Sequence, residues 1–202
     1  MTVLVLMTFP AVAQKDVIWP TYFKVVGVAD NDVLNVRGLP NSSAPIVGEL
    51  APNSGPIEVL ASQNGWAQVS TGEGMGWVSE HFLEEMVLPV IGDTALPEGL
   101  RCGGTEPFWG LEIDTARVVL DDMNEGVSTF PMFETGQFAN RAGSLNFFIA
   151  AGEGGQMTGI ISNRICSDGM SDRLYGRSID LLISTPEGTS AVSGCCSVPA
   201  SQ

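Results

Sequence analysis

Three acidic residues have the types and spacing that could support catalysis. Glu106 lies in the stretch C-G-G-T-E-P-F-W, and Asp168 and Asp172 lie in C-S-D-G-M-S-D. Two carboxylates can act as acid and base on a glycosidic bond, or they can bind Ca²⁺. The same residue types also suit turns, because Asp side chains hydrogen-bond to nearby backbone groups, and Glu106 could brace Arg101 or Arg173. We favour this structural interpretation.

Other catalytic and cofactor sites find little support. His81 is the only histidine, so a Ser-His-Asp or Cys-His site would have to reach across the chain. The cysteines show no C-x-x-C pattern and no Cys/His spacing typical of zinc sites. The glycine pairs Gly103-Gly104 and Gly154-Gly155 are not followed by Lys-Ser/Thr, so they predict hairpin turns and not phosphate loops. We therefore expect no metal and no cofactor, and the sequence favours a protein without enzymatic activity.

The composition predicts an all-β protein. Hydrophobic residues make up 44% of the 202 residues, and 24 glycines and 12 prolines separate short apolar runs. Short apolar runs separated by turn residues are typical of β-hairpins and not of long helices. The net charge of −14 disfavours binding to nucleic acid or to an anionic lipid surface.

The N-terminal segment is interpreted as part of an export signal. Residues 1–13 carry no charge and end in Ala-Val-Ala, a small-x-small cleavage site. The basic region that opens such signals is missing, so the true start codon is expected upstream. The segment is too short to span a bilayer, which takes about 20 apolar residues, and no transmembrane segment is expected. Four cysteines behind an export signal predict disulfides.

Residues 20–84 are predicted to form a small β-barrel of short strands separated by Asn, Pro and Gly turns. Within them Leu34-Asn35-Val36-Arg37 precedes Pro40, and Gly65-Trp66 is followed by Gly76-Trp77-Val78. These motifs resemble those of the bacterial SH3-like (SH3b) family. The resemblance covers almost the whole segment and implies an adaptor of envelope proteins that binds peptides or cell-wall material and does not catalyse.

The tryptophans of this module have two interpretations. General burial habits favour Trp77 in the core and Trp66 half-buried in a turn. The alternative is a ligand groove in which Trp66, Trp77, Asn35 and Arg37 meet a peptide, with Arg37 pairing to a carboxylate. Arg37 could equally brace the acidic turn at residues 30–32.

Residues 85–97 are predicted to be a linker. The segment contains two prolines and is not a flexible Gly/Ser tether. Its apolar residues Val87, Leu88, Val90 and Ile91 are expected to dock on a domain face. The two modules are therefore expected to pack against each other with limited freedom.

Residues 98–202 are predicted to form a second antiparallel β-domain, a curved sheet or small barrel. Trp109, Leu111 and Ile113 alternate with polar or small residues, and the strand that starts at Arg117 is expected to pair with them. The motifs G-T-E-P-F-W, C-S-D-G-M-S and G-C resemble those of an uncharacterised family of bacterial envelope proteins, loosely grouped with META-type β-domains. The resemblance implies secretion and a β-fold, without an activity.

The disulfide pairing stays open among three alternatives. Cys166–Cys195 would join two of the family-like motifs, and Cys102–Cys196 would tie the start of the domain to its end. The runner-up exchanges Cys195 and Cys196. Each loop closed in this way would contribute about 3–5 kcal/mol in the chain-entropy model.

The favoured function is a non-catalytic, periplasmic or secreted envelope protein that binds peptidoglycan, a peptide or a protein partner. The alternative is a small-ligand carrier or hydrolase inhibitor that uses the second domain, and a carboxylate-dependent cell-wall hydrolase comes third. An apolar cavity would favour the carrier, and facing carboxylates would favour the hydrolase. The candidate ligand contacts are Asn35, Arg37, Trp66 and Trp77 in the first module and Glu106, Trp109 and Asp168 in the second. The sequence does not indicate an oligomeric state.

Overall fold

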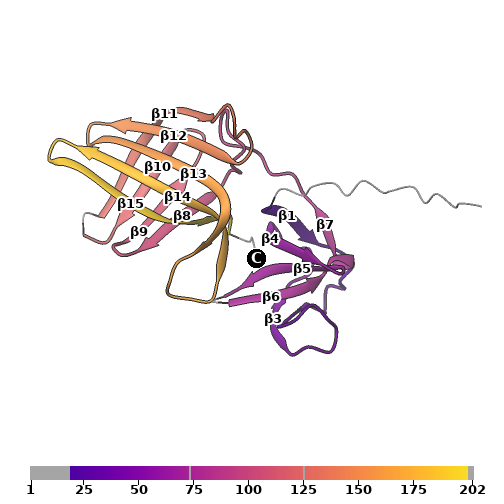
Figure 1. Ribbon diagram of the computed structural model, residues 1–202. Helices are drawn as coiled ribbons and strands as arrows, with labels where there is room; N and C mark the ends of the chain where they lie inside the picture. Colours follow the sequence, from indigo (N-terminus) through magenta and orange to yellow (C-terminus); the bar gives the residue numbers. More distant parts are fainter. Residues whose placement is uncertain (1–18, 73, 125, 200–202) are drawn as a thin grey trace, which may run out of the picture.

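The computed structural model describes residues 19–72, 74–124 and 126–199. The predicted signal segment, residues 1–13, lies outside them. The described chain forms two β-domains that lie side by side (Figure 1), so the all-β prediction is confirmed. Within these ranges no helix is long and apolar enough to cross a membrane.

The first domain is a seven-stranded antiparallel sheet in the order β3-β2-β6-β5-β4-β1-β7. Alternating apolar residues bury one face of each strand, as Leu34 and Val36 do in β2 and as Ala67 and Val69 do in β5. A 3₁₀ turn at Glu80–Phe82 precedes the last strand. The strands are β1 Thr21–Val25, β2 Leu34–Arg37, β3 Ile46–Leu50, β4 Ile57–Gln63, β5 Trp66–Thr71, β6 Gly74–Ser79 and β7 Leu83–Glu85.

The second domain is a closed barrel of eight antiparallel strands. Each strand pairs with the next along the chain, and the last strand returns to pair with the first (Figure 1). That closing seam joins three residue pairs only, from Cys195↔Gly103 to Ser197↔Arg101. The strands are β8 Leu100–Thr105, β9 Phe108–Ile113, β10 Arg117–Asp122, β11 Gly126–Gln137, β12 Leu145–Gly152, β13 Gly155–Ser167, β14 Leu174–Thr185 and β15 Gly188–Ser197.

The barrel interior is filled by side chains from all around the wall. Trp109, Leu111 and Ile113 point inward from β9, which confirms the predicted alternation. The turn that follows β9 is held by Asp114, whose Oδ1 accepts from the backbone N–H groups of Ala116 and Arg117 at 2.7 and 2.8 Å. These contacts set the register of β9 against β10.

Glycines make room for the indole of Trp109. A Cβ at Gly104 would lie 2.3 Å from Trp109 Nε1, and one at Gly194 would lie 2.8 Å from Trp109 Cζ2. The prediction that Gly103-Gly104 forms a hairpin turn is wrong, because both residues lie within β8, where Gly104 packs on this ring. The turn prediction at Gly154-Gly155 is confirmed by the β12–β13 hairpin.

The segment between the domains becomes part of the barrel. Ile91 and Leu96 are buried in the barrel core, and the N–H of Ala95 donates to Asn146 Oδ1 at 2.8 Å. Docking of Ile91 agrees with the expectation for the linker, whereas docking of Val87 and Val90 does not. Val87 is 93% exposed and Val90 is 49% exposed, because the chain enters the barrel core only at Ile91.

Both disulfides lie in the barrel. Cys102 is bonded to Cys196 and Cys166 to Cys195, which is the first of the pairings weighed above. Cys102 and Cys196 are buried cross-strand partners on β8 and β15. This bond therefore joins the first and last strands at the closing seam.

Candidate functional site

One face of the first domain collects the residues of its sequence motifs. Arg37 on β2 is the cross-strand partner of Trp77 on β6, and Trp77 is the partner of Gln68 on β5. Cross-strand partners have side chains on the same face of a sheet, and so do residues two apart on one strand. Asn35 and Trp66 therefore share this face, which is opposite to the core. We call Asn35, Arg37, Trp66, Gln68 and Trp77 the tryptophan face.

The tryptophan face is half-buried. The prediction that Trp77 belongs to the core is wrong, because Trp77 lies between the buried residues Gly76 and Val78 and points to the other side of the sheet. Arg37 Nη1 donates to the carbonyl oxygen of Ala44 at 2.9 Å. Among the described residues no ion pair joins Arg37 to an acidic residue of the 30–32 turn.

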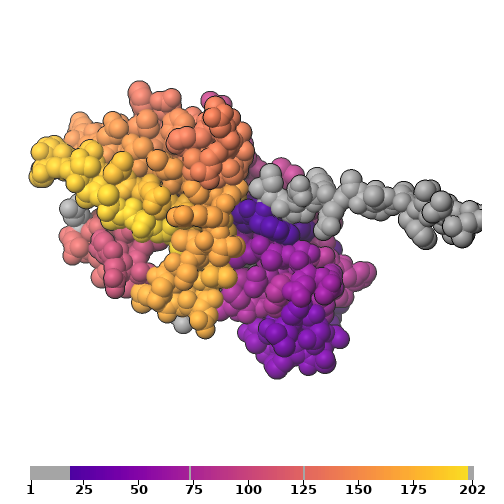
Figure 2. Space-filling view, in the orientation of Figure 1, coloured from indigo at the N-terminus to yellow at the C-terminus, as the bar shows by residue number. Residues whose placement is uncertain are grey.

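The three motifs of the second domain meet at one cleft on the barrel wall. The cleft has a volume of about 430 Å³, and Figure 2 shows the molecule hollowed between the β8–β9 segment and the β13–β14 loop. The loop reaches back to β8, where Thr105 Oγ1 donates to the carbonyl oxygen of Asp168 at 3.0 Å. The lining includes Glu106, Arg164 and the Cys166–Cys195 disulfide.

The carboxylate of Asp168 is engaged by its own loop. Its Oδ1 accepts from the backbone N–H groups of Met170 and Ser171, both at 3.0 Å, and its Oδ2 accepts from the hydroxyl of Tyr175 at 3.1 Å. These hydrogen bonds, first of all those from the backbone of Ser171 and Met170, hold the pKa of Asp168 below its ordinary value. The Asx-turn interpretation thus describes what this side chain does.

We expect the titration of Asp168 to report this hydrogen bonding. Because the folded pKa is lowered, the stabilisation is present above the ordinary value of 3.8 and disappears as the pH falls through the folded value. The Tyr175→Phe variant removes one donor and should move the midpoint upward, as measured by NMR of the side-chain carboxyl carbons. Asp114, which is held by another turn, serves as the internal control. An unchanged Asp168 midpoint would contradict the assignment.

Glu106 does not brace either arginine proposed for it. Arg101 Nη2 is 2.8 Å from Glu112 Oε1, and Arg173 Nη2 donates to Ser197 Oγ at 3.4 Å. The structure brings Glu106 and Asp168 to the same cleft but engages Asp168 elsewhere. In the described ranges no cluster of His, Cys, Asp and Glu side chains could hold a metal ion.

Trp109 lies away from both surfaces. Its side chain is 6% exposed and belongs to the barrel core. On its outer edge it contributes to a second hollow of about 380 Å³ at the barrel mouth, between β9 and the β14–β15 hairpin. Pro107, Ile183 and Val192 supply apolar surface there.

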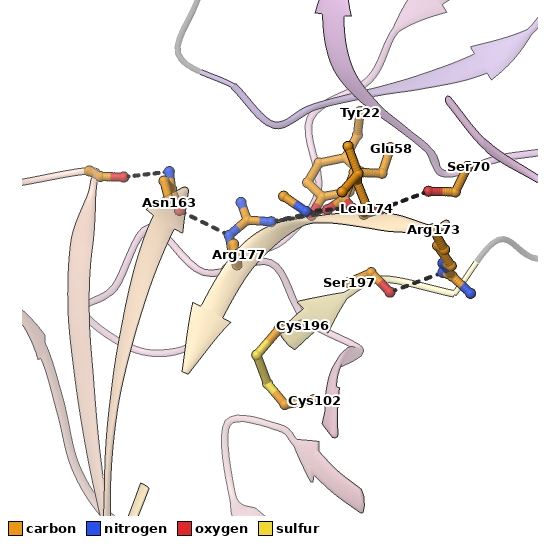
Figure 3. A network of polar contacts seen from close by, with 12 residues as sticks. Tyr22, Glu58, Ser70, Cys102, Asn163, Arg173, Leu174, Arg177, Cys196 and Ser197 are labelled. Carbon is orange, nitrogen blue, oxygen red and sulfur yellow. Dashed lines mark hydrogen bonds and ion pairs between the residues drawn. A yellow bond between two sulfur atoms is a disulfide. The ribbon is translucent and has the colours of Figure 1, made fainter. Parts of the chain in front are cut away.

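A buried polar network joins the two domains (Figure 3). Arg177 of β14 is 3% exposed and donates to the hydroxyl of Tyr22, and its Nη1 is 3.5 Å from Glu58 Oε1. The N–H of Gly176 donates to Glu58 Oε2 at 3.3 Å, and Arg177 Nε donates to Asn163 Oδ1 at 3.0 Å. We call Tyr22, Glu58, Asn163, Gly176 and Arg177 the interface network.

Burial is the main cause of the pKa shifts in this network. It raises the pKa of Glu58, with Arg177 and the N–H of Gly176 offsetting part of the effect. It also raises the pKa of the Tyr22 hydroxyl well above its ordinary value. These buried groups lose their partners when the domains separate. The stability of the interface therefore depends on correct docking of the two domains.

Further contacts hold the domains in one orientation. Ser70 Oγ donates to the carbonyl oxygen of Leu174 at 3.0 Å (Figure 3). The N–H of Leu174 lies 3.2 Å from Met75 Sδ. Gly176 allows close approach, because a Cβ there would lie 2.5 Å from Pro20. These residues were not predicted from the sequence to have a functional role. The one available signal was the lone charge of Glu58 between the apolar residues Ile57 and Val59.

Comparison with known proteins identifies part of the chain. Residues 32–84 match the bacterial SH3 domain family. No curated protein and no solved structure matches the chain. The first domain is thus a bacterial SH3 domain, and the eight-stranded barrel that follows it carries both disulfides.

Proposed function

We propose that this protein is a non-catalytic binding protein of the bacterial cell envelope, and that its SH3 domain takes peptide or cell-wall material on the tryptophan face. One observation carries the proposal: Asn35, Arg37, Trp66 and Trp77 come from three strands and share the face of the sheet that is opposite to the core. Domains of this family typically bind cell-wall material.

The compartment is supported by the chemistry of the barrel. Disulfides persist in oxidising compartments outside the cytoplasm, and all four cysteines here are paired. Together with a bacterial SH3 domain they suggest an extracytoplasmic protein. We propose more specifically that the protein is periplasmic or secreted, as the N-terminal segment predicts.

The tryptophan face suits a ligand that is part sugar and part peptide. Trp66 and Trp77 are diagonal neighbours across β5 and β6, within reach of a common ligand. Indole rings provide flat apolar area and an N–H donor, and the guanidinium of Arg37 can pair with a carboxylate. Asn35 adds an amide beside Arg37 on the same strand.

We expect Trp66→Ala and Trp77→Ala each to weaken binding to purified peptidoglycan by about tenfold, which corresponds to about 1.4 kcal/mol. The measurement is sedimentation of the folded protein with insoluble peptidoglycan over a range of protein concentrations. Phe133→Ala is the matched control, because it removes an aromatic ring of the barrel that is 74% exposed. Equal retention of all three variants and the wild type would overturn the assignment to this face.

The second candidate is a small-ligand carrier, and the hollow beside Trp109 is the observation that favours it. Its lining combines apolar residues of β9, β14 and β15 with polar and acidic ones, among them Asp122 and Glu187. Binding of an apolar fluorescent probe that is lost in Val192→Asp, with peptidoglycan binding unchanged, would support this alternative. A cell-wall hydrolase draws less support, because Asp168 is engaged by its own loop.

A further inference from the structure

A cavity of about 630 Å³ lies where the two domains meet. The SH3 domain contributes Ser70 and Gly72, and the barrel contributes Arg101, Arg173 and Ser197, among others. Its volume falls within the range of small-molecule sites, which is about 300–1,000 Å³. None of the five residues of the tryptophan face lines the cavity, although Ser70 lies on the same face of β5 as Trp66 and Gln68.

The cavity is unusual in its charge. The chain has 9 Lys and Arg residues against 23 Asp and Glu residues, yet two arginines line this one cavity. Arg101 shares its charge with Glu112, and the Asp168 carboxylate on the rim is taken up by its loop. Arg173 forms no ion pair with another described residue, although its charge acts on the nearby Glu58 carboxyl, so it is the lining cation with the weakest pairing.

The guanidinium of Arg173 is held in place, but not all of its N–H donors have an acceptor among the described residues. It lies over the ring of Tyr175, 4.7 Å from the ring centre, and donates to Ser197 Oγ at 3.4 Å. Within the described part of the chain, its buried Nε has no hydrogen-bond acceptor. Arginine carries five N–H donors in a planar fork, and the terminal Nη1 and Nη2 groups of Arg173 match the two oxygens of a carboxylate.

The walls of the cavity are pre-formed. The hydrogen bond from Ser70 Oγ to Leu174 holds the SH3 domain against the loop that carries Arg173. Gly176, which belongs to the interface network, lies two residues after Leu174 on β14 (Figure 3). A site that is already assembled binds a ligand without an added ordering cost.

We infer that this interdomain cavity is a second binding site, which takes the C-terminal carboxylate of a short peptide through Arg173. Arg101 adds positive charge to the lining, and Ser197, whose Oγ accepts from Arg173, can donate its own hydroxyl proton to the ligand. The remaining volume receives the one or two residues that precede the carboxylate. Free small carboxylates share this chemistry but fill less of the cavity, so they bind more weakly.

The test is calorimetric titration of the disulfide-bonded full chain at about 0.15 M salt, where the Debye length of about 8 Å screens the overall negative charge. The probes are N-acetyl-dialanine, its C-terminal amide and acetate. The dipeptide acid should bind at least tenfold more tightly than the amide or acetate. Equal binding of acid and amide would overturn the carboxylate assignment, and equal binding of acetate would reduce the site to a general anion site.

Variants locate the site. Arg173→Gln should weaken binding of the dipeptide acid at least tenfold. Arg173→Lys keeps the charge without the planar fork, so its affinity should lie between those of the wild type and Arg173→Gln. Arg117→Gln is the matched control, because it removes an arginine that is paired with Asp114 outside the cavity. Binding that survives in a folded Arg173→Gln protein would exclude this site. Since Trp66→Ala leaves the cavity intact, failure here and failure of the SH3 proposal are distinguishable.

Discussion

Replacing Cys102 and Cys196 together by serine is expected to lower the free energy of unfolding by about 4–5 kcal/mol. The bond closes a loop of 94 residues, the longer of the two loops, and its loss frees the most chain entropy in the unfolded state. It also joins β8 to β15 where only three residue pairs close the barrel. Guanidinium denaturation of the oxidised proteins measures the difference.

The second disulfide supplies the comparison. Cys166 and Cys195 are 29 residues apart, so replacing both by serine should cost about 3–4 kcal/mol. Cys166 is also partly exposed at the barrel wall, and its bond ties β15 to β13 and does not cross the β15–β8 seam, although Cys195 itself pairs with Gly103 there. A larger loss for this pair than for Cys102 and Cys196 would contradict the role given to the seam.

Replacing Glu58 by alanine is expected to lower the free energy of unfolding by about 3–5 kcal/mol. The substitution leaves the guanidinium of Arg177 in a buried interface without its carboxyl partner, and it removes the acceptor of the Gly176 N–H. Chemical denaturation measures this loss. Limited proteolysis of residues 86–90 reports the accompanying separation of the domains.

A surface glutamate of the same domain is the matched control. Glu84 pairs with Lys24 at 2.9 Å, with both side chains largely in solvent, and Glu84→Ala should cost no more than about 1 kcal/mol. The double variant Glu58→Leu/Arg177→Met removes both charges and should recover most of the stability lost in Glu58→Ala. If the double variant is as unstable as the sum of its single variants, the two residues do not act as a pair.

Strands with simple alternation could be predicted from the sequence. Trp109, Leu111 and Ile113 in β9 show a clean period of two, and the motifs around Asn35 and Trp66 indicated the SH3 domain. Strand β11 could not be predicted, because its sequence holds Pro131 and mixes apolar with polar residues. Its irregular pattern accompanies a register shift against β12 between Met132 and Glu134.

The candidate sites were predictable to different degrees. Residues two apart on a strand share a face, so Asn35 and Arg37 could be placed together, whereas the position of Trp77 opposite Arg37 depended on strand order. The interface network and the Arg173 cavity could not be predicted, since a charge at an outward strand position normally faces solvent. Docking of the second domain turns Glu58 from a surface residue into a buried one.

The pairing of β15 with β8 also determines when the barrel can close during folding. Every other neighbour in the barrel is the next strand along the chain, so hairpins from β8 to β14 can form as soon as they leave the ribosome or a translocation channel. The seam has to wait for residues 195–197, and until then the edges of β8 and β15 are unpaired strand edges that can associate with other chains. The SH3 domain, complete by residue 85, precedes the barrel in this order and offers its docking face to β14 before the barrel is closed.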